Sequence, residues 1–232
     1  LRKRASPLLL PVAVLIAELH AGVPLTVVHW GTDQGLAPGP LICVLQTRDG
    51  YLWLGGEEGL MRFDGVKSTE FSTRNTPQLR AKMISALHED EQGGLWIGTA
   101  GGGLTYRSRN GDWQRYGPEG GLENERVSAI AQDSAGRLWV GTDGGGIFIN
   151  GGNGEFYAFA QNDKLPTQHI EALCADENGT IWIGSGGKLC RVRHGNFDEG
   201  FAPSGEIPPS TFVLLRRADG VLWVGGREGL SC

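Results

Sequence analysis

The sequence predicts an all-β protein built from successive four-stranded sheets, and three observations support this prediction. Glycine makes up 38 of the 232 residues, about 16% against an average of about 7%. This content disfavours helices, because glycine inside a helix costs about 1 kcal/mol relative to alanine. Tryptophans recur at a fixed spacing, together with their neighbours. The apolar content of 40% is enough to build a packed core.

The repeat is centred on five tryptophans: Trp53, Trp96, Trp139, Trp182 and Trp223. The first four are 43 residues apart, and the last follows after 41. Each has an aliphatic residue on either side, a glycine three residues before it and a glycine two residues after it. Units of about 40 to 45 residues with four strands are typical of β-propeller blades. We expect these tryptophans to fill the space between sheets as core residues, rather than to form a platform for stacking sugars or bases.

The third unit illustrates the expected elements. Strands are predicted at residues 127–132, 137–141, 147–150 and 155–159. Asp133 starts the first turn, where its side chain can bind nearby backbone N–H groups. A run of three glycines, residues 144–146, starts the second reversal, because glycine adopts positive φ at little cost.

The chain holds about four and a half such blades. We expect them at about residues 41–71, 83–116, 127–159, 170–201 and 211–232. A lone outer strand, Leu25–Trp30, precedes the first blade, and in closed propellers such a strand completes the last blade. Four and a half blades do not close a ring of roughly six or seven, and both ends would be open sheet edges. We therefore expect the chain to be the front part of a longer protein whose propeller has about seven blades.

The N-terminus has the pattern of a targeting segment. Arg2, Lys3 and Arg4 precede the apolar run Leu8–Ala17, which is too short for a bilayer that needs about 20 residues. Residues 1–22 are therefore expected to be a signal peptide, and residues 23–232 the incomplete propeller. Pro11 interrupts the run and no Ala-x-Ala cleavage site follows, which count against a signal peptide. A buried N-terminal helix is the alternative, although Glu18 and His20 come too soon for a helix of normal length.

Three segments resemble a known repeat: QTRDGYLWLGGEEGLMRFDG (46–65), EDEQGGLWIGTAGGGL (89–104) and QDSAGRLWVGTDGGGI (132–147). They resemble the two-component regulator propeller repeat, and the lead-in HWGTDQGLAPGP (29–40) resembles the start of such domains. The resemblance covers roughly residues 25–232. It implies the periplasmic sensor region of a homodimeric receptor, tethered to the inner membrane by a downstream helix. The implied output is a histidine kinase, often a hybrid, or a diguanylate cyclase, so this chain itself is expected to catalyse nothing.

The candidate ligand-binding residues lie just before the innermost strands, where successive blades meet. They are Lys82, Asn124, Arg126, Gln168 and His169. In a propeller these junctions surround one mouth of the central channel, and loops from every blade converge there. The expected ligand is a small molecule, an oligosaccharide or a periplasmic protein. A solvated loop surface is the competing interpretation.

Several function classes are disfavoured. The net charge is −5 and the pI about 5.6, so there is no basic footprint for nucleic acid. The segment Asp176–Thr180 has too few oxygen ligands for calcium, and the glycine runs lack the lysine and helix of a phosphate loop. No cofactor is expected.

The four cysteines are Cys43, Cys174, Cys190 and Cys232. Their spacing gives no metal motif, although Cys190 and Cys232 follow equivalent leucines and would lie near one another across a blade interface. Two alternative functions stay open. One is a secreted propeller lyase resembling streptogramin lyases, and the other is a protein-interaction scaffold.

Overall fold

The computed structural model describes residues 30–232 except 33–34, 37–38, 153, 202–210 and 218. The expected signal peptide, residues 1–22, lies outside the described residues, as does the lone strand before the first blade apart from Trp30. By compactness the chain divides into Leu1–Trp30 and Gly31–Cys232. All the strands described below belong to the second unit.

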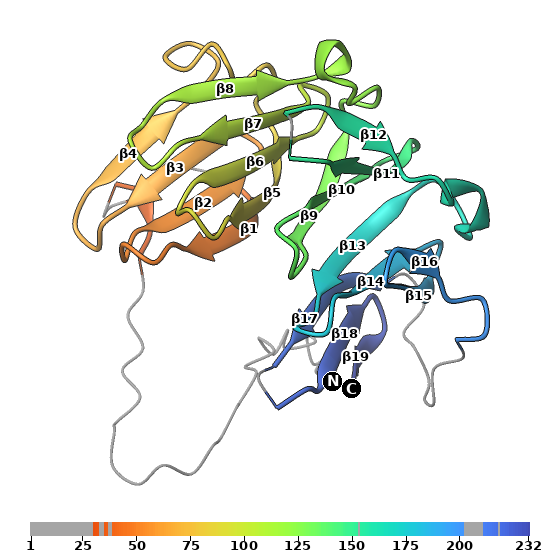
Figure 1. Ribbon diagram of the computed structural model, residues 1–232. Coiled ribbons are helices and arrows are strands. Elements are labelled where there is room, and N and C mark those ends of the chain that lie inside the picture. The colour runs from red at the N-terminus through yellow and green to blue at the C-terminus, as the bar shows by residue number, and fades with distance from the viewer. Residues whose placement is uncertain (1–29, 33–34, 37–38, 153, 202–210, 218) are drawn as a thin grey trace, which may run out of the picture. The chain divides into compact units, whose positions relative to one another are not determined.

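Five antiparallel sheets follow one another along the chain, and within each the strands are in sequence order (Figure 1). The first sheet comprises β1 (Leu41–Gln46), β2 (Leu52–Gly56), β3 (Gly59–Phe63) and β4 (Ser68–Phe71). The second comprises β5 (Ile84–Glu89), β6 (Leu95–Thr99), β7 (Leu104–Arg107) and β8 (Trp113–Tyr116). The third comprises β9 (Val127–Gln132), β10 (Leu138–Thr142), β11 (Gly146–Asn150) and β12 (Phe156–Ala158). The fourth comprises β13 (Ile170–Ala175), β14 (Thr180–Ser185), β15 (Lys188–Arg193) and β16 (Asn196–Phe197). The fifth comprises β17 (Thr211–Arg216), β18 (Leu222–Gly226) and β19 (Gly229–Ser231).

The all-β propeller prediction is confirmed. The first four blades have four strands each, and the fifth has three. The total of about seven blades stays a prediction. Short 3-10 helices at Pro118–Gly120 and Asn162–Lys164 interrupt the links between sheets. Within the described ranges, no helix is both long enough and apolar enough to cross a membrane.

Each sheet packs on the next through its innermost strand: β1 on β5, β5 on β9, β9 on β13 and β13 on β17. The two faces of a sheet differ. One face carries the tryptophan, and we call it the tryptophan face. The other, which we call the leading face, carries the aliphatic residues on either side of the tryptophan. Trp139, only 1% exposed, shares a buried cluster with Ile181 and Ile183 of the following sheet. This pairing explains why an aliphatic-Trp-aliphatic triplet recurs.

The same pairing is found at the two preceding interfaces. Trp53 clusters with Leu95 and Ile97, and Trp96 clusters with Leu138 and Val140. Both tryptophans are buried. Trp182 and Trp223, in the fourth and fifth sheets, are partly exposed.

In the first three sheets, the glycine two residues after the tryptophan leaves room for the next sheet. A Cβ at Gly141 would lie 2.5 Å from Cγ2 of Ile170, and one at Gly98 would lie 2.5 Å from Cγ1 of Val127. These distances are shorter than a carbon–carbon contact allows, so a side chain here would push the sheets apart. The glycine three residues before the tryptophan has a different role. Gly136, with φ of 78°, makes the turn that a side chain would strain.

An aspartate at the start of three β-turns ties the turn to the tryptophan. Asp133 Oδ1 accepts hydrogen bonds from the backbone N–H groups of Ala135 and Arg137, at 3.0 and 2.9 Å. Its Oδ2 accepts one from the Trp139 indole N–H at 2.9 Å. Equivalent indole bonds join Asp90 to Trp96 at 3.1 Å and Asp176 to Trp182 at 3.4 Å. The sequence predicted the turn bonds, but the indole bond was not foreseen.

Candidate functional site

The links between sheets are held by glycine N–H groups of the preceding hairpin. In the third sheet, Gly144 and Gly146 donate from their N–H groups to the carbonyl of Gln168, at 3.1 and 2.9 Å. In the second sheet, Gly101 and Gly103 hold the carbonyl of Glu125 in the same way, at 3.0 and 2.9 Å. The glycine runs therefore fix the backbone just before β9 and β13, and so they place the predicted site residues of these two links.

Asp143, in the β10–β11 hairpin, is the centre of a side-chain cluster that includes residues of both links. Its Oδ1 lies 2.5 Å from Nδ1 of His169. Its Oδ2 accepts hydrogen bonds from Nε and Nη2 of Arg126, at 3.0 and 2.6 Å. Asn124 donates from Nδ2 to the Asp143 carbonyl at 3.3 Å, and its Oδ1 accepts from the Arg126 N–H at 2.9 Å. We call these four residues the Asp143 cluster.

The Asp143 cluster joins two sheets and faces solvent. Its His169 side chain is 65% exposed, that of Arg126 64% and that of Asp143 41%. The hydrogen bond from His169, followed by those from Arg126, holds the pKa of Asp143 below its ordinary value. The carboxylate is therefore charged at neutral pH, and it orients two exposed nitrogen-bearing side chains that can form hydrogen bonds with a ligand.

Sequence reasoning foresaw three members of the Asp143 cluster and missed its centre. Asn124, Arg126 and His169 come together, whereas Gln168 turns away and donates from Nε2 to the Asn162 carbonyl at 2.8 Å. One feature of the sequence pointed to Asp143. The glycine-rich run of the third blade reads TDGGG where that of the second reads TAGGG.

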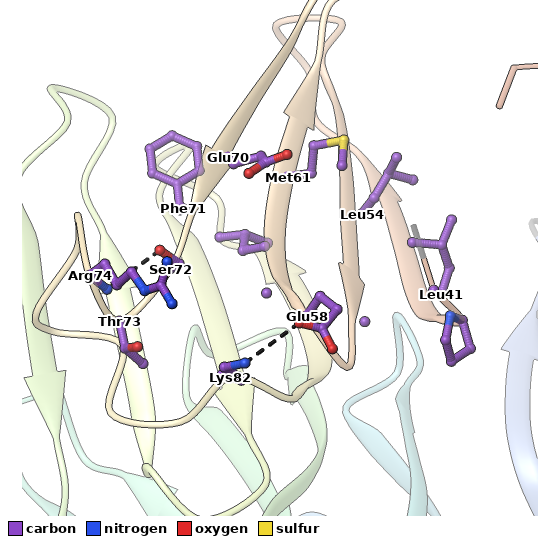
Figure 2. Close-up of a pocket in the computed structure, with 15 residues that line it drawn as sticks. Leu41, Leu54, Glu58, Met61, Glu70, Phe71, Ser72, Thr73, Arg74 and Lys82 are labelled. Atoms are coloured by element: carbon purple, nitrogen blue, oxygen red, sulfur yellow. Dashed lines mark hydrogen bonds and ion pairs between the residues drawn. The ribbon is translucent and has the colours of Figure 1, made fainter. Parts of the chain in front are cut away.

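Lys82 lies apart from the Asp143 cluster, beside a pocket of about 540 Å³ on the first sheet (Figure 2). Its Nζ is 3.6 Å from Oε2 of Glu58, in the β2–β3 hairpin, and both side chains are exposed. The close-up shows Met61 and Glu70 on the sheet, with Lys82 and Glu58 below them joined by the marked ion pair.

Metal and thiol chemistry have little support in the described part of the chain. No group of three His, Cys, Asp or Glu side chains there is arranged to hold a metal ion. All four cysteines are free, so the considered Cys190–Cys232 pairing is not formed. Burial raises the pKa of the Cys43 thiol to about 12 and also raises those of Cys174 and Cys190, which makes these thiols poor nucleophiles.

Comparison with known families matches three segments of the chain to the two component regulator propeller: residues 78–101, 121–144 and 164–187. Each segment spans a link, an innermost strand and the strand that carries the tryptophan. The chain carries two component regulator propeller repeats. The resemblance seen in the sequence motifs is thereby confirmed. No curated protein matches the chain in sequence.

Solved structures with this fold include extracellular domains of bacterial proteins and an enzyme. The extracellular domain of a protein classed as a hybrid two component system from B. thetaiotaomicron is 23% identical, with a TM-score of 0.68 over 82% of this chain and 27% of that one. Another extracellular domain from B. thetaiotaomicron belongs to a protein classed as a one component system. It is 23% identical, with a TM-score of 0.65 over 82% of this chain and 29% of that one. Virginiamycin B lyase from Staphylococcus aureus is 15% identical, with a TM-score of 0.63 over 82% of this chain and 68% of that one.

At these identities the likeness to solved structures shows the fold alone. The chain spans little more than a quarter of the two extracellular domains that it resembles. A signal-transduction propeller is the function class that the repeats and these neighbours support together.

Proposed function

We propose that this chain is part of the extracytoplasmic sensor propeller of a membrane receptor and that it binds a ligand without catalysing a reaction. The match to the two component regulator propeller repeats carries this proposal. The extracellular location of the two similar B. thetaiotaomicron domains supports the placement outside the cytoplasm. The proposal requires two further parts of the receptor: a helix that anchors it in the inner membrane, and a kinase or cyclase output domain. The full-length receptor is most simply a homodimer.

The proposed ligand site is the Asp143 cluster. Arg126 presents an exposed donor just before β9, His169 presents an exposed ring nitrogen just before β13, and Asp143 holds both in place. A small molecule or an oligosaccharide can accept a hydrogen bond from Arg126 while one of its hydroxyl groups donates to the free ring nitrogen of His169, and so bridge the third and fourth sheets. To signal, the ligand must bind two receptor states unequally, because equal binding shifts no equilibrium. The Lys82 pocket on the first sheet is a second place where such a ligand can bind.

A lyase is the alternative that an observation favours. The chain resembles virginiamycin B lyase over 68% of that protein, and His169 is paired with a carboxylate as a general base commonly is. The side chain of His169 is 65% exposed, which argues against this alternative, because catalytic sites commonly exclude water from the reacting groups.

Thermal unfolding in the presence of candidate ligands tests the sensor proposal. The purified chain is screened against oligosaccharides and small carboxylic acids. At about 100 times its dissociation constant, a ligand stabilises the folded state by about 2.7 kcal/mol, which raises Tm by about 5 °C or more. Arg126→Ala is expected to abolish the shift. Arg193→Ala, which removes an exposed arginine on β15, is the control and is expected to retain it.

Two results would contradict the assignment of the site. A ligand whose shift survives in Arg126→Ala but is lost in Lys82→Ala would place the site in the first-sheet pocket. Ring opening of a macrocyclic lactone, detected by mass spectrometry and lost in His169→Ala, would establish the lyase instead.

A further inference from the structure

Two arginines lie at the interface between the first and second sheets, one on each sheet. Arg62 lies opposite Trp53 in the strand register, so it belongs to the tryptophan face of the first sheet. Arg107 lies opposite Leu95, so it belongs to the leading face of the second sheet, which packs on that tryptophan face. Both sheets of this interface belong to the chain. We call Arg62 and Arg107 the arginine pair.

Aromatic rings hold both guanidinium groups. The Cζ atom of Arg62 lies 4.5 Å from the centre of the Tyr51 ring and 5.9 Å from that of the Trp53 ring. The Cζ atom of Arg107 lies 5.5 Å from the centre of the same Trp53 ring and 5.8 Å from that of the Trp113 ring. Both arginines are half-buried. Contacts of this kind orient a guanidinium group but leave its full positive charge in place.

No carboxylate contact neutralises the arginine pair. Among the described residues, neither side chain has an ion-pair or hydrogen-bond partner, and Nε of Arg107 is buried without one. Burial and then the charge of Arg62 lower the pKa of Arg107. The charge of Asp49 opposes this shift, but its Oδ1 accepts hydrogen bonds from the Thr47 hydroxyl and the Tyr51 N–H. The two like charges therefore repel each other, and an anion beside them would relieve that repulsion.

Stacked arginines in other sheets are neutralised by an aspartate. In the third sheet, Arg137 stacks on the tryptophan and donates from Nε to Oδ2 of Asp133 at 2.8 Å. In the fourth sheet, Arg191 does the same and donates from Nε to Oδ2 of Asp198 at 2.8 Å. The arginine pair thus departs from the pattern that the chain follows elsewhere.

The fourth sheet shows which residue makes the difference. Arg191 and Arg62 each lie opposite the tryptophan of their own sheet. Asp198 lies beside Arg191, because its N–H donates to the Arg191 carbonyl at 3.0 Å. In the first sheet, Thr69 pairs with Arg62 and so occupies the place of that aspartate. A neutral, exposed threonine therefore stands where a carboxylate would complete the contact.

We propose that the arginine pair binds an oxyanion group, a sulfate or phosphate ester carried by a ligand of the propeller. The ester supplies the negative charge that Asp198 supplies to Arg191. Guanidinium groups bind such oxyanions through their fork of N–H donors. Partial burial strengthens the attraction, because a half-buried charge is screened less than one in open water. The Asp143 cluster lies on other sheets, so this second site does not depend on the ligand site proposed above.

Thermal unfolding of the purified chain in sodium sulfate, sodium phosphate or sodium chloride, at equal ionic strength, tests the proposal. Sulfate and phosphate stabilise most proteins by exclusion from their surfaces, so each salt effect is compared between variants. At about ten times its dissociation constant, a bound oxyanion should raise the wild-type Tm by about 3 °C beyond that general effect. The salt with the larger shift identifies the ester.

Thr69→Asp and Thr69→Asn form a matched pair of variants. Aspartate places an internal carboxylate beside Arg62, whereas asparagine has the same shape without the charge. Because Thr69 is exposed, both variants should fold. We expect the oxyanion shift to be lost in Thr69→Asp and retained in Thr69→Asn.

Arginine variants locate the bound anion. Arg62→Gln and Arg107→Gln should each lose the shift, whereas Arg193→Gln, which removes an exposed arginine on β15, should retain it. Circular dichroism in chloride confirms that each variant is folded. Three results would each overturn the proposal: a shift in Thr69→Asp equal to that of the wild type, a loss in Thr69→Asn as large as that in Thr69→Asp, or a loss in Arg126→Ala, which would place the anion at the Asp143 cluster.

Discussion

Replacing Asp133 by alanine should destabilise the protein more than most single substitutions do. The carboxylate is 2% exposed and accepts hydrogen bonds from two backbone N–H groups, from the Arg137 side chain and from the Trp139 indole. After the substitution, water can solvate the turn and Arg137, but the indole N–H stays buried, because Trp139 is 1% exposed. An orphaned buried donor costs about 1–3 kcal/mol, and a lost turn bond adds about 1 kcal/mol. We expect a loss of about 3 kcal/mol.

Urea denaturation followed by tryptophan fluorescence and far-UV circular dichroism measures this loss. For a chain of this size, a loss of about 3 kcal/mol lowers Tm by roughly 6–12 °C. Asp163→Ala, which removes an exposed aspartate from a link, is the control and should change stability by less than about 0.5 kcal/mol.

A double-mutant cycle isolates the indole bond. Trp139→Phe removes the donor, so Asp133→Ala should cost about 1 kcal/mol less in that background. A loss below about 1 kcal/mol in the wild-type background, or the absence of coupling in the cycle, would refute the reasoning.

Three further predictions follow from the packing and the charges. Gly141→Ala should cost more than about 2 kcal/mol by urea denaturation, because its Cβ overlaps Ile170, whereas the equivalent Gly225→Ala should cost under about 1 kcal/mol; equal costs would refute the close-approach explanation. Burial is the main cause that lowers the pKa of His88 below its ordinary 6.5. The unfolded chain therefore takes up a proton first, and stability should fall as the pH drops below about 6.5. His88→Gln should flatten that profile, and an unchanged profile would assign the acid sensitivity to other groups. Asp143→Asn should weaken any ligand that Arg126→Ala also weakens, as measured by titration calorimetry, and intact affinity would separate the ligand from the Asp143 cluster.

The fold was predictable because its determinants are local and repeated. A tryptophan with aliphatic neighbours fills the space between sheets, and a glycine two residues later admits the next sheet. Both requirements recur at each interface, so the pattern is visible in the sequence. The structure also explains why the residue at this position is glycine, which the periodicity shows but does not explain. Gly141 is needed because the Ile170 side chain of the next sheet approaches it.

The site was less predictable because its contacts cross between sheets. Arg126 and His169 were recognised by their places before innermost strands, but Asp143 lies in a hairpin and its partners depend on how two blades meet. Lys82 occupies a similar place in sequence, yet its side chain pairs with Glu58 of the β2–β3 hairpin and not with the Asp143 cluster. Sequence position alone did not separate these two environments.

The central claim is that this propeller is the sensor part of a membrane receptor, and the coding DNA that follows the Cys232 codon tests it most directly. The account predicts an open reading frame that continues through further tryptophan-centred repeats, then about 20 apolar residues, then a kinase or cyclase domain. A frame that ends soon after a sixth or seventh repeat, with no membrane span, would contradict the receptor and leave a secreted lyase or scaffold as the better account.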